Sequence, residues 1–112
     1  MPKRIALIDL DGVLNNYRGD YNKNKIPAIR KGAKEFLEKI SEDYVIEIFT
    51  VRDKELTRSW LEENGLSIFV SDITRVKNAF ASLIVDDRAI RFEGDFEKTL
   101  NDVKNFKPFW EK

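Results

Sequence analysis

Short apolar segments alternate with helical patterns along the chain, and this alternation limits the fold more than any other feature of the sequence. Segments rich in Ile, Val, Leu and Phe, without strict alternation of polar and apolar residues, are typical of parallel strands covered on both faces. These segments are Arg4–Ile8, Tyr44–Phe49, Ser67–Val70 and Ser82–Val85. Helical patterns between and after them predict an α/β fold, a three-layer Rossmann-like parallel sheet with helices on both faces.

The predicted helices have recognisable ends. Pro27 lies near the first turn of the first helix, where its missing N–H is harmless. The second helix has Asp53 as its N-cap and stops at Gly65, a shorter helix is expected over Thr74–Phe80, and the last begins near Asp95. Their expected buried faces consist of Ile29, Ala33, Phe36, Leu37 and Ile40 in the first, Leu56, Trp60 and Leu61 in the second, and Phe96, Leu100 and Val103 in the last.

Length and charge narrow the class of protein. The 112 residues amount to about three quarters of a typical domain, so residues 1–112 are expected to form one domain. Lys and Arg number 20, as do Asp and Glu, so no overall charge attracts nucleic acid or an anionic membrane. The apolar stretch from Ile5 is interrupted at Asp9 and is too short for a signal peptide or a membrane span. A soluble cytoplasmic protein is therefore expected.

The sequence contains neither His nor Cys, and this restricts the chemistry that the chain can perform. Disulfides, thiolate nucleophiles, imidazole bases and zinc sites built from His or Cys are excluded. Catalysis would depend on carboxylates, hydroxyls, Lys, Arg, Tyr and backbone amides, together with a hard cation that binds oxygen.

Two acidic pairs follow predicted strands, at the edge of a parallel sheet where ligands bind. Asp9 and Asp11 follow the first strand, and Asp86 and Asp87 follow the last. Four carboxylates in one place repel one another unless protons or a cation neutralise them, and Mg²⁺ prefers oxygen ligands. A single Asp at a strand end is usually a cap or turn residue. The matching positions of both pairs and of Thr50 instead favour a site.

Three segments resemble motifs of one enzyme family. Asp9-Leu-Asp11-Gly-Val-Leu14 resembles the first motif of the haloacid dehalogenase (HAD) superfamily, whose members are mostly Mg²⁺-dependent phosphatases. Ile46-Glu-Ile-Phe-Thr50 is similar to the second motif, and Leu83-Ile-Val-Asp86-Asp87 to the fourth. The order and spacing fit the family, and the resemblance covers nearly the whole chain.

The resemblance implies a role for each of these residues. Asp9 would be the nucleophile that forms an aspartyl-phosphate, and Asp11 would be the general acid and then the general base. Mg²⁺ would be held by the Asp9 carboxylate, the Asp11 backbone carbonyl and Asp86, with Asp87 binding directly or through water. Thr50 would donate a hydrogen bond to a phosphoryl oxygen.

Basic residues near the motifs are expected to complete the site. Lys77 is the expected phosphate-clamping lysine of the third motif, against the alternative of an ordinary solvated lysine, and Arg75 and Lys54 are its rivals. Arg52 and Arg88 directly follow motif residues. Each would either pair with a neighbouring carboxylate or grip the substrate with its guanidinium.

The sequence has no room for the cap domain that HAD enzymes usually carry, so the resemblance implies an open site. In the family, a missing cap accompanies large substrates or a neighbouring subunit that acts as a lid, which leaves a homo-oligomer open. In the loop Asn15–Ile26, Tyr17 and Tyr21 would either stack on a base or sugar or lie beneath a solvated loop. The aromatic tail Phe106–Trp110 is expected to pack against the sheet or helices, with a dimer surface as the alternative.

These expectations describe a capless, HAD-type, Mg²⁺-dependent phosphatase whose substrate is a small molecule, a nucleotide or an oligonucleotide end. The Thr50-x-Arg52 and Asp86-Asp87-Arg88 patterns are also similar to the phosphatase half of polynucleotide kinase–phosphatases, which makes a 3′-phosphatase one alternative. A non-catalytic phospho-binding or receiver-like signalling module is the alternative of another class. The order of motifs argues against it. Receivers carry their acidic pair near the first strand and their lysine after the last strand, whereas here the nucleophile-like pair comes first and Asp86-Asp87 last.

Overall fold

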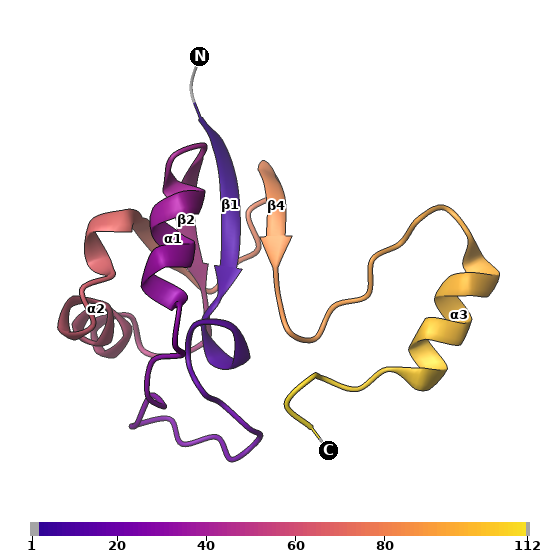
Figure 1. Cartoon of the computed structure of the whole chain (residues 1–112), viewed down its shortest axis with the longest axis horizontal. Helices are drawn as coiled ribbons and strands as arrows, with labels where there is room; N and C mark the ends of the chain where they lie inside the picture. Colours follow the sequence, from indigo (N-terminus) through magenta and orange to yellow (C-terminus); the bar gives the residue numbers. More distant parts are fainter. Residues whose placement is uncertain (1–2, 112) are drawn as a thin grey trace.

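A four-stranded, all-parallel sheet in the order β3-β2-β1-β4 forms the centre of the protein (Figure 1). The structure, a computed structural model, describes residues 3–111. The strands are β1 (Arg4–Asp9), β2 (Tyr44–Phe49), β3 (Val70–Thr74) and β4 (Ala81–Val85), the helices are α1 (Ala33–Ser41), α2 (Lys54–Glu63) and α3 (Phe96–Asn105), and the short helical turns are η1 (Leu10–Leu14) and η2 (Ser67–Phe69). The predicted α/β, Rossmann-like fold class is confirmed.

The strand order reverses at β1. The chain runs outward from β1 through β2 to β3 and then returns, so that β4 pairs with the opposite side of β1. Ile5 of β1 consequently lies between Val45 of β2 and Ala81 of β4. Ligands of open parallel sheets bind at such a reversal, beyond the carboxyl ends of the strands. Asp9, the last residue of β1, lies at this point.

The main core lies between one face of the sheet and the helices α1 and α2. Side chains alternate between the two faces of a strand, and one face contributes buried Ala6 and Ile8 from β1. The buried residues that pack with them include Ile46 and Ile48 of β2, Ala33 and Leu37 of α1, and Trp60 and Leu61 of α2. The opposite face carries Leu7, Phe49 and Ile84 and borders an open hollow of about 770 Å³.

The third strand is Val70–Thr74 rather than the predicted Ser67–Val70. The apolar residues at 68–70 follow buried Leu66, but Ser67–Phe69 forms the turn η2 instead of pairing with β2. Polar residues continue the strand because β3 lies at the edge of the sheet. Ser71 there donates a hydrogen bond to the carbonyl of Ile46 at 2.9 Å.

The helix predicted over Thr74–Phe80 is absent. Thr74 ends β3, and its hydroxyl bonds to both the N–H and the carbonyl of Val76 at 3.0 Å. The side chain of Asn78 accepts a hydrogen bond from the N–H of Phe80 at 2.8 Å. Local bonds from Thr and Asn side chains compete with helical hydrogen bonds and hold the backbone in turns.

The first helix begins at Ala33, later than the apolar pattern from Ile29 predicts. Gly32 precedes it with a φ of 92°, a left-handed conformation that a right-handed helix cannot contain. Ile29 instead forms an isolated antiparallel bridge with Asn15. The segment before α1 is thereby held against the turn that follows β1.

The last helix begins after its predicted N-cap, Asp95, whose side chain accepts a hydrogen bond from the N–H of Lys98. Its apolar residues are not buried as predicted: Phe96 is 76%, Leu100 61% and Val103 56% exposed. Figure 1 shows α3 standing apart from the sheet, beyond β4. The radius of gyration, 14.8 Å, accordingly exceeds the value of about 13 Å for a compact chain of this size.

A bilayer-spanning helix needs a long apolar stretch. Within residues 3–111, no helix meets that requirement.

Candidate functional site

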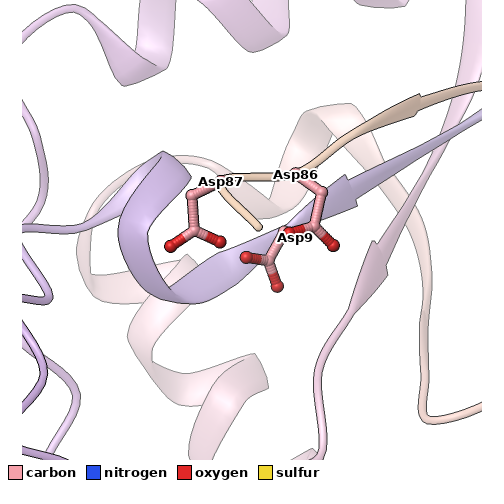
Figure 2. Close-up of side chains that lie close together, drawn as sticks. All are labelled: Asp9, Asp86 and Asp87. Atoms are coloured by element: carbon pink, nitrogen blue, oxygen red, sulfur yellow. The ribbon is translucent and has the colours of Figure 1, made fainter. Parts of the chain in front are cut away.

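Three of the four predicted carboxylates meet where β1 and β4 end. Asp9 is the last residue of β1, and Asp86 and Asp87 directly follow β4. Because Ile8 and Val85 are partners in the parallel ladder, the aspartates leave neighbouring strands at the same level. One carboxylate oxygen from each lies within 4.8 Å of the other two, and Figure 2 shows the three side chains gathered at this edge.

Two oxygens in this cluster, Asp9 Oδ2 and Asp87 Oδ1, are buried without a hydrogen-bond partner among the described residues. The Asp87 side chain is only 1% exposed, and a buried, unpaired carboxylate is costly. Mg²⁺ holds opposite oxygen ligands about 4.2 Å apart, which is compatible with three carboxylate oxygens that lie within 4.8 Å of one another. The donor set and its unpaired oxygens therefore fit a hard divalent cation.

The crowding of carboxylates changes their protonation. Burial, a hydrogen bond with Asp87 and the charges of Asp86, Asp87 and Asp11 raise the pKa of Asp9 to about 8. Burial opposes ionisation of Asp87 too, but hydrogen bonds with Trp110 and Asp9 outweigh it and hold the pKa of Asp87 below its ordinary value. Near neutral pH, the cation-free protein thus keeps a proton on Asp9.

Cation affinity is expected to rise with pH up to about pH 8. A bound cation must displace the proton on Asp9, so below pH 8 the affinity should fall by up to about tenfold per pH unit. Calorimetric titrations with Mg²⁺ in buffers of different ionisation enthalpy measure the released proton. Asp9→Asn carries no such proton and is the control. An affinity that stays constant between about pH 6 and pH 8 would contradict this prediction.

The same pKa shift makes the stability of the cation-free protein depend on pH. The pKa of Asp9 rises from 3.8 to about 8 on folding, so the unfolded chain binds fewer protons than the folded one between these values. The free energy of unfolding therefore falls as pH rises through this interval, by up to about 1.4 kcal/mol per unit.

The Asp11 side chain is not one of the three clustered carboxylates, because other partners hold it. Arg52 forms a bidentate ion pair with it, from Nε to Oδ2 at 2.9 Å and from Nη2 to Oδ1 at 3.0 Å. Asn15 donates from Nδ2 to Asp11 Oδ1 at 3.1 Å. Asn15 is itself fully buried, and its Oδ1 accepts hydrogen bonds from the N–H groups of Gly12 and Tyr17. The Asp11 carboxylate is thus fixed in one orientation.

Arg52 has the contacts of an ion pair rather than those of a substrate-binding residue. Its side chain is fully buried, and its Nη1 donates to the carbonyls of Asn22 at 2.7 Å and Lys25 at 3.4 Å. The guanidinium also lies over the ring of Tyr21, 4.5 Å from its centroid. Of the two roles expected for Arg52, pairing with a carboxylate or gripping the substrate, these contacts match pairing with a carboxylate. The contacts with Asn22, Lys25 and Tyr21 also connect the loop Asn15–Ile26 to the site.

Thr50 lies one position beyond Phe49, the residue paired with Asp9. It is buried, and its Oγ1 accepts a hydrogen bond from the N–H of Arg52 at 3.2 Å. Since the oxygen accepts this bond, the hydroxyl proton is available for donation.

Of the remaining basic residues, Lys77 and Arg88 border the hollow that Asp86 also lines, and Lys54 and Arg75 do not. Lys77 is exposed and lines the hollow of about 770 Å³ together with Asp86 and Arg88. The Arg88 side chain is 68% exposed, with Nε 3.9 Å from Asp87 Oδ1. Of the rivals of Lys77, Lys54 pairs with Asp72 at 3.4 Å, and Arg75 lies exposed beyond β3.

The aromatic tail was predicted to pack against the sheet or helices, but its Trp110 returns to the site and contacts the loops there. Trp110 donates a hydrogen bond from Nε1 to Asp87 Oδ2 and makes an edge-on contact with the ring of Tyr17, with centroids 5.2 Å apart. Pro108 is buried, whereas Phe109 is 64% exposed. Sequence reasoning missed the contacts of Trp110 and Asn15, because no periodicity or motif connects them with the acidic pairs.

Replacement of Gly12 by Ala is expected to destabilise the protein and weaken cation binding. Gly12 has a φ of 87°, and a Cβ there would collide with Asp87 Oδ2. Gly32→Ala is a matched control, because Gly32 has a φ of 92° but no atom within 4 Å of a built Cβ. Both variants should lose about 1–2 kcal/mol from backbone strain, and only Gly12→Ala should lose more in thermal melts and bind Mg²⁺ less tightly. Equal effects would contradict the close approach of Gly12 and Asp87.

Comparisons with known proteins give the fold but no activity. No family model matches the chain, and no curated protein matches it either. A solved structure of a conserved protein from Bacteroides thetaiotaomicron is similar, with a TM-score of 0.60 and 21% sequence identity over 96% of this chain and 95% of that chain. A likeness at this identity indicates a shared fold and leaves the function to be inferred from the site.

Proposed function

We propose that the protein is a Mg²⁺-dependent phosphatase that acts through an aspartyl-phosphate. One observation carries the proposal: Asp9, at the reversal point of the sheet, has a buried carboxylate oxygen without a hydrogen-bond partner among the described residues, and its carboxylate lies close to those of Asp86 and Asp87. A carboxylate at the end of a central strand, beside a site for a hard cation, is a suitable nucleophile for phosphorus.

Asp9, Asp86 and Asp87 would hold the cation through carboxylate oxygens, with the Asp11 backbone carbonyl as a further ligand. The bound cation would neutralise charge on the phosphoryl oxygens and on the crowded carboxylates. It would also replace the proton that Asp9 keeps in the cation-free protein because burial and neighbouring carboxylates raise its pKa, and so leave Asp9 ionised for attack.

In the first step, an Asp9 carboxylate oxygen forms a bond to phosphorus as the bond from phosphorus to the leaving oxygen breaks. Asp11, which must carry a proton at this stage, would donate that proton to the leaving oxygen, which departs as an alcohol. The ion pair with Arg52 and the hydrogen bond from Asn15 keep the Asp11 carboxyl group in one orientation for this transfer.

In the second step, Asp11 accepts a proton from water as the water oxygen attacks phosphorus. The bond from phosphorus to Asp9 breaks, inorganic phosphate leaves, and both carboxyl groups return to their starting states. The hydrogen bonds from Arg52 keep the Asp11 carboxyl group in one orientation for this transfer as well.

Residues around the cluster would bind the phosphoryl group. The Thr50 hydroxyl proton, not used by the bond from Arg52, can be donated to a phosphoryl oxygen. Lys77 and Arg88 border the same hollow as Asp86 and would supply positive charge to the substrate. Because this hollow is open, small molecules, nucleotides and oligonucleotide ends all remain in the substrate class.

Phosphate release from aryl phosphate, sugar phosphates, nucleotides and phosphorylated oligonucleotides, with Mg²⁺ and with EDTA, tests the proposal. Hydrolysis that EDTA abolishes is expected. A salt-sensitive preference for oligonucleotides would favour the 3′-phosphatase. Cation binding without hydrolysis of any substrate would instead support a non-catalytic phospho-binding module and refute the phosphatase.

A further inference from the structure

The C-terminal tail reaches the carboxylate cluster from a distant part of the chain. After Asp87 the chain leaves the sheet, passes through the exposed helix α3 and then turns back (Figure 1). Pro108 is buried and Trp110 is half-buried, so the segment that follows α3 packs against the rest of the protein.

The indole of Trp110 fits between two loops and one aspartate. Its Nε1 donates to Asp87 Oδ2 at 2.5 Å, and its ring meets the ring of Tyr17 edge-on, at an interplanar angle of 77°. A Cβ built on Gly12 would lie 3.0 Å from Nε1, and one built on Gly19 would lie 3.2 Å from the indole ring. Glycines at these two positions leave the space that the indole occupies.

The hydrogen bond from Trp110 involves only one of the two Asp87 carboxylate oxygens. Oδ2 accepts from the indole, while Oδ1 is buried and has no hydrogen-bond partner among the described residues. One oxygen of Asp87 belongs to the group of carboxylate atoms that lie close enough together to share a cation. A carboxylate held at one oxygen cannot rotate freely about its Cβ–Cγ bond. The indole N–H is only a donor, so it cannot compete with Asp87 for a cation.

We propose that Trp110 is a positioning residue for the cation site, which fixes Asp87 so that Oδ1 faces Asp9 and Asp86. This inference rests on the cation site of the proposed function but not on phosphatase activity. The C-terminal tail would then contribute to cation binding, since partners that orient metal ligands typically contribute about 10–100-fold to metal affinity.

Mg²⁺ affinity of Trp110→Phe, measured by calorimetry, tests the role of the indole N–H. Phe keeps an aromatic ring beside Tyr17 but removes the donor, and a 10- to 100-fold weaker affinity is expected. Phe109→Leu, a change at the exposed neighbouring position, should bind as the unmodified protein does. Equal affinities of Trp110→Phe and the unmodified protein would overturn the inference. If the unmodified protein binds no Mg²⁺, the proposed function fails as well.

A fluorescence titration gives a second readout that does not depend on the folding of Trp110→Phe. The chain has two tryptophans, so in Trp60→Phe the emission comes from Trp110 alone. Mg²⁺ should shift or quench this emission as it occupies Asp87 Oδ1, with the midpoint that calorimetry gives. Unchanged emission at saturating Mg²⁺ would overturn the role assigned to Trp110.

Discussion

Asp9→Asn is expected to reduce Mg²⁺-dependent phosphate release by about 10⁴-fold or more. Removal of a nucleophile that forms a covalent intermediate has effects of this size, and the amide cannot attack phosphorus. The fold should persist, because Asn has nearly the same shape as Asp and, like the protonated Asp9 carboxyl group, carries no charge in the crowded cluster. Initial rates with an aryl phosphate, together with circular dichroism and a melting curve for each variant, measure both effects.

Asp43→Asn is the matched control for this experiment. Asp43 is an exposed aspartate that precedes β2, at the end of the parallel sheet opposite the site, so its variant should keep full activity. If Asp9→Asn retains more than a few per cent of the rate of Asp43→Asn, Asp9 is not the nucleophile.

Arg52→Met is expected to lower the free energy of unfolding by about 3–5 kcal/mol. The loss of one partner from a buried ion pair leaves the other charge without compensation, and the Arg52 side chain is fully buried against a largely buried Asp11. Two backbone carbonyls of the loop Asn15–Ile26 would also lose their donor. Chemical denaturation gives the free energy, and activity should fall with it because Asp11 loses its orientation.

Two comparisons separate the ion pair from other effects of this substitution. Arg58→Met removes an exposed pair with Glu55 on α2 and should cost less than about 1 kcal/mol. Combining Asp11→Asn with Arg52→Met should cost less than the sum of the two single changes, because the two side chains act together. Purely additive losses would show that Arg52 stabilises the protein through the loop alone.

The sequence was a good guide to the sheet and to the position of the acidic pairs. Strands built from dense apolar segments, such as Tyr44–Phe49, match the structure because burial on a parallel sheet strongly limits composition. The order of strands and helices then places Asp9, Asp86 and Asp87 at the same edge. These features depend on local patterns, which a sequence displays directly.

Features set by tertiary contacts could not be predicted in this way. The helical pattern of Phe96, Leu100 and Val103 predicts an apolar face but not whether anything covers it, and the structure leaves it exposed. The segment Thr74–Phe80 is held by side-chain bonds that override its helical pattern. The bond from Trp110 to Asp87 joins residues with no shared motif, and only the three-dimensional arrangement reveals it.

The reversal of strand order also bears on how the protein folds. β1 pairs with β2, a nearer segment of the chain, and with β4, a more distant one, and distant pairings form more slowly because larger loops must close. The β1–β2–β3 part of the sheet can therefore assemble first, with Asp9 in place before its partner aspartates arrive. Since β4 is an edge strand, local opening there would separate Asp86 and Asp87 from Asp9 without unfolding the rest. A ligand bound by residues of both β1 and β4 would therefore stabilise the pairing of these strands against local opening.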